Sequence, residues 1–254
     1  MNDPITDALG GLAVAAPAPL RDRVFGGWTT SPSLLGEVFV AFTSDGVQFV
    51  RPVGSAGDAE QVAEAYRTRF GRPLRRADRA PAGVLPALRG GAGDAARLDL
   101  TASSEFERAV LAATRHIPAG QTRPYGWVAR EAGRPRAVRA VGTVLARNPV
   151  PLLVPCHRVV RSDGALGEYM FGPAHKEALL RGEDVNLDEV AALASRGVHY
   201  LGSDTTGVVC FPTCRDARRI TPGHRHGFRT LGAAQAAGYR PCRHCRPAAV
   251  AVPA

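Results

Sequence analysis

The five cysteines of this 254-residue chain fall into two groups whose spacing predicts two kinds of chemistry. Cys156 stands alone, directly before His157, and a lone cysteine can act as a nucleophile when its thiol is ionised. Two close pairs of cysteines can instead hold a metal ion as a tetrahedral thiolate site, for which zinc is the expected ion. The second group forms a C-x3-C-x27-C-x2-C array from Cys210, Cys214, Cys242 and Cys245.

A plainer interpretation exists for each group. Cys156 can be a buried structural cysteine beside a surface histidine. Because neighbouring side chains of an extended segment point to opposite faces, His157 is expected to reach the Cys156 sulfur only through a water or a bend at Pro155. The array can be a purely structural zinc site. Three nearby histidines are expected to face solvent and not to bind metal: His224, His226 and His244.

Size and composition narrow the class of protein. With 45% hydrophobic residues, the chain can form one large domain or a few small ones. An odd cysteine count without a secretory signal favours a reducing compartment, and we expect a cytoplasmic, nucleoid-associated protein. The apolar residues 9–20 follow Asp3 and Asp7, which favours a short mobile N-terminus over a signal peptide. No apolar stretch is long enough to span a membrane, so no membrane partner is expected.

The net charge of +9 is distributed unevenly along the chain. Residues 1–100 hold 11 basic and 11 acidic side chains, whereas residues 101–182 hold 12 and 6, and residues 197–254 hold 8 and 2. The two basic blocks are also the two blocks that contain cysteines. This pattern favours a polyanionic partner, with arginine-rich composition alone as the plainer explanation.

The hydrophobic pattern predicts an α/β protein of several domains. Apolar and polar residues alternate through 33–53 around a turn at residues 44–46, which predicts a hairpin, and residues 58–70 have helical spacing. Residues 71–93 are rich in Gly, Pro and Arg and are expected to form loops. We therefore expect a β-containing N-terminal domain over residues 1–100.

The central block predicts helices and a short apolar segment that delivers Cys156. One helix is expected from about Ser103 to Arg115. Two shorter ones follow, from Tyr125 to Ala132 and from near Pro135 to Arg147, and their tight connection in a basic block predicts a helix-turn-helix. Two packed helices of an ordinary bundle are the alternative. A further helix ends at Gly182, an acidic connector covers 183–196, and another domain begins near residue 197.

A longer string of residues resembles the O6-alkylguanine-DNA alkyltransferase family. The resemblance covers about residues 33–184 and is most specific between 101 and 184. It rests on these features: Tyr125, Arg139 within residues 135–142, Asn148 to Pro151, Pro155 to Val160, Gly164 to Gly167, and Glu183.

The resemblance implies a role for each matched residue. Cys156 would accept the alkyl group from O6 of guanine, His157 would act as base through a water, and Glu183 would orient His157. Tyr125 would donate a proton to the departing guanine, and Asn148 would brace the turn before the active-site segment.

The same resemblance implies how DNA is held. Arg139 would fill the gap left by a nucleotide rotated out of the stack, and the second short helix would enter the minor groove. Phe171 predicts poorer reaction with O6-benzylguanine than with O6-methylguanine. The other implied contacts are Ala137, Val138 and Gly142 for DNA, and Pro151, Val159 and Met170 for the base pocket.

Residues 205–214 and 236–247 resemble the Ada-type zinc domain, over about residues 187–248. This resemblance implies that Cys210 accepts a methyl group from a methylphosphotriester and that Zn2+ is the cofactor. Methylation would make the site less negative and raise its affinity for DNA. The order of modules differs from Ada, and with the array near residue 254 no transcriptional role is expected. Four arginines are the expected phosphate contacts: Arg215, Arg218, Arg219 and Arg240.

The sequence thus predicts a monomeric repair protein with three domains: residues 1–100, a helix-turn-helix and active-site domain over 101–184, and a small α/β zinc domain over 185–254. Its expected partner is double-stranded alkylated DNA, and each acceptor cysteine is expected to react once. The main alternative limits repair to Cys156 and makes the zinc domain a DNA-docking or damage-sensing module. A cysteine hydrolase that uses Cys156 and His157 is the third hypothesis.

Overall fold

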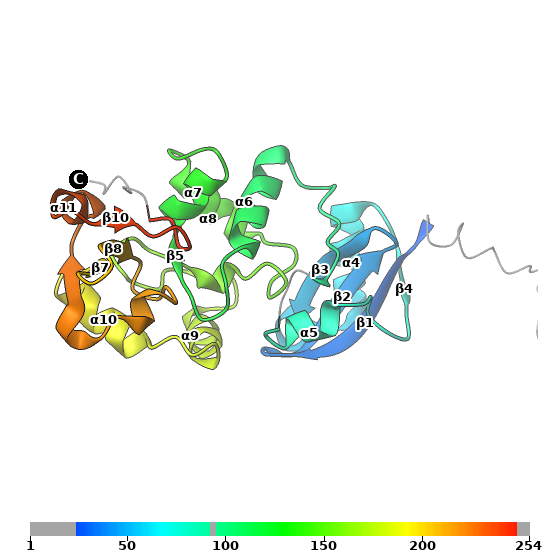
Figure 1. Cartoon of the computed structure of the whole chain (residues 1–254). Helices are drawn as coiled ribbons and strands as arrows, with labels where there is room; N and C mark the ends of the chain where they lie inside the picture. The colour runs from blue at the N-terminus through cyan, green and yellow to red at the C-terminus, as the bar shows by residue number, and fades with distance from the viewer. Residues whose placement is uncertain (1–23, 92–94, 248–254) are drawn as a thin grey trace, which may run out of the picture.

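The computed structural model describes residues 24–91 and 95–247, and the predicted mobile N-terminus lies outside these residues. From one end to the other, Figure 1 shows a sheet with its helices, a central group of helices, and a smaller sheet that contains the last strands. The predicted mixed α/β fold is confirmed. Within the described residues, no helix is long and apolar enough to cross a membrane.

The N-terminal sheet is built around the predicted hairpin. Strands β2 (Gly36–Thr43) and β3 (Gly46–Pro52) pair antiparallel across the Gly-containing turn, as the alternation predicted. Strand β1 (Gly26–Ser33) pairs with β2, and the short β4 (Leu74–Arg76) lies parallel to β1. The resulting order is β3-β2-β1-β4.

The two faces of this sheet bury different side chains, as the twofold period of a strand requires. Phe39 and Phe49 pack against Val62 and Tyr66 of α4 (Ala59–Phe70), whereas Val40 faces the main core. A capping box at Asp58 starts α4, which confirms the helix predicted at 58–70.

The expectation of loops throughout 71–93 is wrong in part, because this stretch contains β4 and the short helix α5 (Val84–Leu88). Both are too short to show periodicity. Contacts to β1 and to the residue after it hold them in place: β4 pairs with β1, and the Leu34 amide donates to the Leu88 carbonyl of α5.

The central helices surround the segment that carries Cys156. A capping box at Ser104 starts the first of them, α6, close to the predicted position. The third, α8, begins at Val138 and not near Pro135, because residues 134–137 form a turn closed by a hydrogen bond from the Ala137 amide to the Arg134 carbonyl. The elements of this part are α6 (Glu105–Arg115), β5 (Arg123–Pro124), α7 (Tyr125–Glu131), α8 (Val138–Ala146), a 3-10 turn at Cys156–Arg158, β6 (Val159–Val160) and α9 (Pro173–Gly182). The short helix α3 (Val53–Ala56) follows β3 and contacts the N-terminal sheet instead.

The acidic connector is a helix, α10, that leads into the C-terminal unit, here residues 187–247. Its sheet has the order β10-β8-β7-β9 and brings the two cysteine pairs together. The elements are α10 (Leu187–Ser195), β7 (Tyr200–Ser203), β8 (Val208–Cys210), two 3-10 turns at Ala217–Arg219 and Pro222–His224, β9 (Arg225–Phe228), α11 (Leu231–Ala236) and β10 (Arg240–Pro241).

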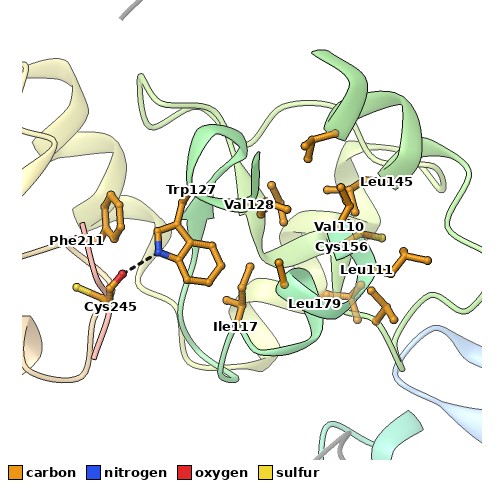
Figure 2. Packing of buried hydrophobic residues seen from close by; sticks show 14 of the residues in the cluster. Val110, Leu111, Ile117, Trp127, Val128, Leu145, Cys156, Leu179, Phe211 and Cys245 are labelled. Carbon is orange, nitrogen blue, oxygen red and sulfur yellow. Dashed lines mark hydrogen bonds between the residues drawn. The ribbon is translucent and has the colours of Figure 1, made fainter. Parts of the chain in front are cut away.

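One hydrophobic cluster connects these parts. It includes Val40 of the N-terminal sheet, Cys156 and the four cysteines of the array. Figure 2 shows Trp127 of α7 between the central helices and the C-terminal unit, with its indole N–H directed at Cys245. The C-terminal unit is therefore packed directly against the central helices.

Candidate active site and metal site

Cys156 begins a 3-10 turn directly after a tight loop, and its side chain is 5% exposed. The loop includes Leu152 at a φ of 71°, a left-handed conformation that a leucine rarely adopts. The Val154 amide donates to the Val150 carbonyl across this loop, with 2.9 Å between N and O. Tertiary contacts must therefore hold the loop in place.

The Asn148 side chain is one such contact, and it is fully buried. Its Nδ2 donates to the Val154 carbonyl at 2.9 Å, and its Oδ1 accepts from the Val150 amide at 3.0 Å. The same Nδ2 lies 3.3 Å from the Cys156 sulfur. Asn148 thus satisfies two buried backbone groups and contacts the thiol.

His157 and Glu183 form a second buried unit beside the thiol. Nε2 of His157 lies 2.9 Å from Oε1 of Glu183, and both side chains are almost fully buried. Glu183 follows the last residue of α9 and also accepts from the Gly120 amide at 3.1 Å. The guanidinium of Arg158 binds the same carboxylate through Nε and Nη2, at 2.8 to 3.1 Å.

These contacts determine the protonation of the group. Burial is the largest single effect and opposes ionisation of Glu183, but the hydrogen bonds and charges of His157 and Arg158 together outweigh it and lower the pKa of Glu183 to about 2. Burial lowers the pKa of His157, so its imidazole is neutral at neutral pH. With the proton on Nε2 facing the carboxylate, Nδ1 carries a free lone pair, and this atom has no hydrogen-bond partner among the described residues.

The Cys156 thiol is held in its neutral form. Burial raises its pKa, while the Asn148 hydrogen bond and the positive charges of Lys176 and Arg51 act in the opposite direction. A neutral thiol needs a base to form the reactive thiolate, and His157 with its free Nδ1 is the neighbouring group that can act as this base.

The segment at Cys156–Arg158 is not extended but bends after Pro155, one of the two alternatives that the sequence left open: it forms a 3-10 turn whose Arg158 amide donates to the Pro155 carbonyl. The bend turns the His157 ring toward Glu183. Among the described residues, Cys156 and His157 form no direct side-chain hydrogen bond with each other, and the bridging water stays a prediction.

Of three cations in this region, the sequence indicated only Arg158, as a candidate source of positive charge for the thiolate; Lys176 and Arg51 were missed. Arg158 lies next to His157 in the sequence, and the structure shows that its guanidinium binds the Glu183 carboxylate. Lys176 is fully buried; its Nζ donates to the Val159 carbonyl at 2.7 Å, and burial lowers its pKa to about 8. A lysine on the face of α9 that also carries Leu179 and Leu180 was a usable signal. Arg51 reaches the Asn148 carbonyl at 3.2 Å from β3, and nothing in the sequence indicated this.

The remaining predicted residues around the thiol lie near it. Tyr125 is half-buried and packs against the cluster that contains Cys156; burial raises its pKa, with Cys156 adding to the effect. Pro151 and Val159 are buried and Met170 is half-buried against the same cluster. Phe171 packs edge-on against the buried Tyr169, with ring centroids 5.5 Å apart.

The predicted DNA contacts lie on α8 and at its N-cap. Arg139 and Val138 are exposed, Ala137 and Gly142 are half-buried, and a side chain at Gly142 would meet open space. Val141 and Leu145 are buried, with Val138 and Gly142 beside them at helical spacing, whereas Arg139 lies on the outer face.

The four cysteines of the array meet in one buried cluster, here called the cysteine cluster. Their sulfur atoms all lie within 4.8 Å of one another. Cys210 ends β8, Cys214 follows in the next turn, and Cys242 and Cys245 come directly after β10, so that parallel pairing of β8 and β10 joins the two pairs. Outside the cluster, Asp216 accepts from the Cys242 thiol at 3.1 Å and contacts His244.

This cluster fits zinc by its chemistry. Hydrogen bonding to Cys214 and Cys245 raises the pKa of Cys210, because four thiols this close cannot all ionise without a cation between them. A divalent ion bound by four sulfurs would hold all of them as thiolates. The expected solvent-facing histidines are exposed, although each bonds an aspartate: His224 and His226 bond Asp204, and His244 bonds Asp216.

A pocket of about 320 Å³ opens over Cys210. Ser203, Thr206, Arg219 and Arg240 contribute to its lining, which places two of the predicted arginines near this sulfur. The other two have partners within the protein. Arg215 lies 2.6 Å from Nε2 of His244, and the guanidinium of Arg218 donates to the Gly120 carbonyl. Arg218 therefore contacts the central part of the chain, although the residue as a whole stays exposed.

Comparison with known proteins agrees with this description. Residues 105–185 match the family described as 6-O-methylguanine DNA methyltransferase, DNA binding domain, and residues 191–248 match the metal binding domain of Ada. The fold is similar to the crystal structure of Mycobacterium tuberculosis OGT in complex with DNA, with a TM-score of 0.51 and 30% identity over 65% of this chain and 98% of that one.

Two curated relatives show where the sequence similarity lies. A methylated-DNA-protein-cysteine methyltransferase of Methanosarcina barkeri is 46% identical over 84 residues, or 33% of this chain and 53% of the relative. The bifunctional transcriptional activator/DNA repair enzyme Ada of Escherichia coli is 46% identical over 81 residues, 32% of this chain and 23% of that protein.

The fold and the two sites thus define a methyltransferase domain joined to a zinc-binding domain, and the cysteine cluster is the group that fits zinc. The chain belongs to the 6-O-methylguanine DNA methyltransferase family. It spans about half the length of the first methyltransferase relatives that it matches.

Proposed function

We propose that this protein repairs alkylated double-stranded DNA directly, by moving an alkyl group from O6 of guanine to Cys156. The observation that carries the proposal is the buried Cys156 thiol beside His157, whose Nε2 is bound by Glu183. A buried neutral thiol with a base and an orienting carboxylate is the arrangement of a thiol nucleophile activated on demand.

The transfer follows from the protonation states. Nδ1 of His157 takes the Cys156 proton through a bridging water, and the thiolate sulfur attacks the alkyl carbon. The C–O bond breaks, its electron pair passes to O6, and the guanine takes a proton from Tyr125, whose raised pKa keeps it protonated until then. The product is a thioether, so each molecule reacts once. Pro151, Val159 and Met170 are proposed to line the pocket of the base.

DNA is proposed to bind across α7 and α8 as a helix-turn-helix. Helix α8 enters the minor groove, where Ala137 and Gly142 allow close approach and Val138 contacts the sugar edge. Arg139 takes the place of the rotated nucleotide. The two basic blocks supply the electrostatic attraction.

A second acceptor is proposed at Cys210. Cys210 is the member of the cysteine cluster that lines a pocket with Asp216, Arg219 and Arg240, and the two arginines suit a phosphate group. When bound, zinc keeps the sulfur in its thiolate form. The Cys210 sulfur attacks the methyl carbon of a methylphosphotriester, and the electron pair of the broken C–O bond stays on the phosphate oxygen as a diester anion.

Mass spectrometry of the zinc-loaded protein after incubation with methylated DNA tests both steps, with Cys156→Ser and Cys210→Ser as matched controls. We expect one methyl group on Cys156 and one on Cys210, each lost only in its own variant. Methyl on Cys156 and never on Cys210 would make the C-terminal unit a DNA-docking module. Methyl on neither residue would refute the proposed repair.

A further inference from the structure

Arg123 is a buried cation at the contact between the central part of the chain and the C-terminal unit. It lies in β5, directly before α7, and is 2% exposed. Its guanidinium carbon lies 5.7 Å from the ring centroid of Trp127 and 5.6 Å from that of Phe211, the residue that follows Cys210. Arg123 therefore sits between the two parts, in the layer next to the cysteine cluster.

The partners of Arg123 are all neutral. Nη2 donates to Oε1 of Gln121 at 2.7 Å, and Nη1 donates to the Thr122 carbonyl at 2.8 Å. Nε is buried and has no partner, and among the described residues no carboxylate forms an ion pair with this side chain. A buried charge without a counter-ion is strongly unfavourable, so an anion must act on Arg123 from nearby.

The cysteine cluster is the negative group in that position. Burial lowers the pKa of Arg123, and the sulfurs of Cys245, Cys214, Cys242 and Cys210 act in the opposite direction by favouring the charged guanidinium. Four thiolates around one divalent ion leave an excess of negative charge, which is also buried and needs compensation.

Other contacts fix the guanidinium relative to the cluster. The Trp127 indole donates to the Cys245 carbonyl at 3.0 Å (Figure 2), and the Thr122 amide donates to Oγ1 of Thr213 at 2.8 Å. On one side of the contact, Thr213 precedes Cys214 and Cys245 is itself a member of the cysteine cluster. On the other side, Thr122 precedes Arg123, and the Trp127 ring lies against the Arg123 guanidinium. The contact is thus formed by the same short segments that carry the charges.

We infer that Arg123 is the counter-ion of the zinc-thiolate cluster and that this pairing joins the methyltransferase part to the zinc-binding part. The metal site is therefore incomplete without a residue from the neighbouring domain. The inference deepens the proposed function at Cys210: methyl transfer removes one thiolate charge, weakens the attraction to Arg123 and loosens the contact between the two parts.

The first test measures zinc affinity of the full chain by competition with a chromophoric chelator. Second-shell groups change metal affinity by about 10-fold to 100-fold, and we expect Arg123→Gln to weaken zinc binding by at least about tenfold. Arg123→Lys keeps the charge and should recover most of this loss. Arg130→Gln is the matched control, because Arg130 lies at the same contact but is partly exposed and paired with Glu131. Equal affinity of Arg123→Gln and wild type would overturn the inference.

The second test leaves Arg123 intact, in case its replacement prevents folding. Cys210→His keeps four zinc ligands but removes one thiolate charge. In the zinc-loaded chains, we expect amide hydrogen exchange over residues 121–128 to be about tenfold faster in this variant than in wild type, with α4 unchanged as an internal control. Unchanged exchange over 121–128 would refute the pairing. The two proposals can fail separately. If Arg123→Gln weakens zinc binding but methyl never appears on Cys210 of wild type, the pairing of Arg123 with the cysteine cluster stands and only the proposed phosphotriester repair fails.

Discussion

Replacing Glu183 with Gln removes the anion that organises the proposed base. The carboxylate is 4% exposed and binds Nε2 of His157, two nitrogens of Arg158 and the Gly120 amide. Glutamine has nearly the same shape but no charge, so Arg158 is left buried without its anion. The substitution therefore tests the electrostatic part of the site with little change in packing.

The expected loss of stability follows from the pKa of Glu183. Lowering it from 4.5 to about 2 corresponds to about 3 kcal/mol of unfolding free energy at pH 7. Because the folded pKa is the lower one, this contribution is fully present above pH 4.5 and is lost as the pH falls toward 2. At pH 3, the linkage between pKa and stability leaves about half of this ~3 kcal/mol contribution.

Urea denaturation of wild type and Glu183→Gln at pH 7 and at pH 3 measures this contribution. Both chains carry the same cysteine cluster, so loss of metal in acid cancels in the difference. Glu177→Gln is the control, since Glu177 pairs with Arg181 on the exposed side of α9 and such pairs contribute little. Alkyl transfer to Cys156 should slow by about 100-fold in Glu183→Gln, because His157 loses its orientation and basicity.

The reasoning fails if Glu183→Gln and Glu177→Gln have equal stability at pH 7, or if the stability difference from wild type does not shrink between pH 7 and pH 3. If Glu183→Gln slows alkyl transfer but its stability difference from wild type is the same at pH 7 and pH 3, Glu183 acts in the chemistry but not through an ion pair with Arg158.

Four further outcomes are expected. Asn148→Ala should destabilise the chain by about 2 to 4 kcal/mol in urea denaturation, because two buried backbone groups lose their partner. Arg218→Ala removes the bond to the loop that holds Glu183 and should slow alkylation of Cys156 by about threefold, at a cost of about 1 kcal/mol in stability. Removing zinc with a chelator should shift the fluorescence of Trp127 to the red, because its indole loses the Cys245 carbonyl. Single-turnover rates should be lower for O6-benzylguanine than for O6-methylguanine, since Phe171 packs rigidly against Tyr169.

Three of these outcomes have a matched control. Arg229→Ala removes an exposed arginine of the C-terminal unit to which no role is assigned, and it should leave alkylation of Cys156 unchanged. The fluorescence measurement uses a Trp28→Phe background, so that Trp127 is the single reporter. Phe171→Ala should bring the two substrate rates closer together. A wild-type stability for Asn148→Ala would contradict its bracing role, and equal rates on both substrates would contradict the role of Phe171.

Local patterns predicted the N-terminal hairpin and several of the longer helices, but none of the individual strands of the C-terminal unit. The β2–β3 hairpin, α4, α6 and α9 were visible because each has its own periodicity, turn or cap, which need no distant partner. Strand β4 and helix α5 were missed because they are short and are held by contacts to β1. The start of α8 was misplaced, since a proline at the first turn of a helix and one in the preceding turn look alike in sequence.

The sequence by itself determined the chemistry: which cysteines stand alone, which form two close pairs, and which residues around them resemble known sites. Residue type and spacing suffice for that, because they fix which groups can act as nucleophile or as metal ligand. Only the tertiary structure decided what acts on these groups. Lys176, Arg51 and Arg123 reach their sites from segments far away in the chain, and charge acts through space, not along the sequence.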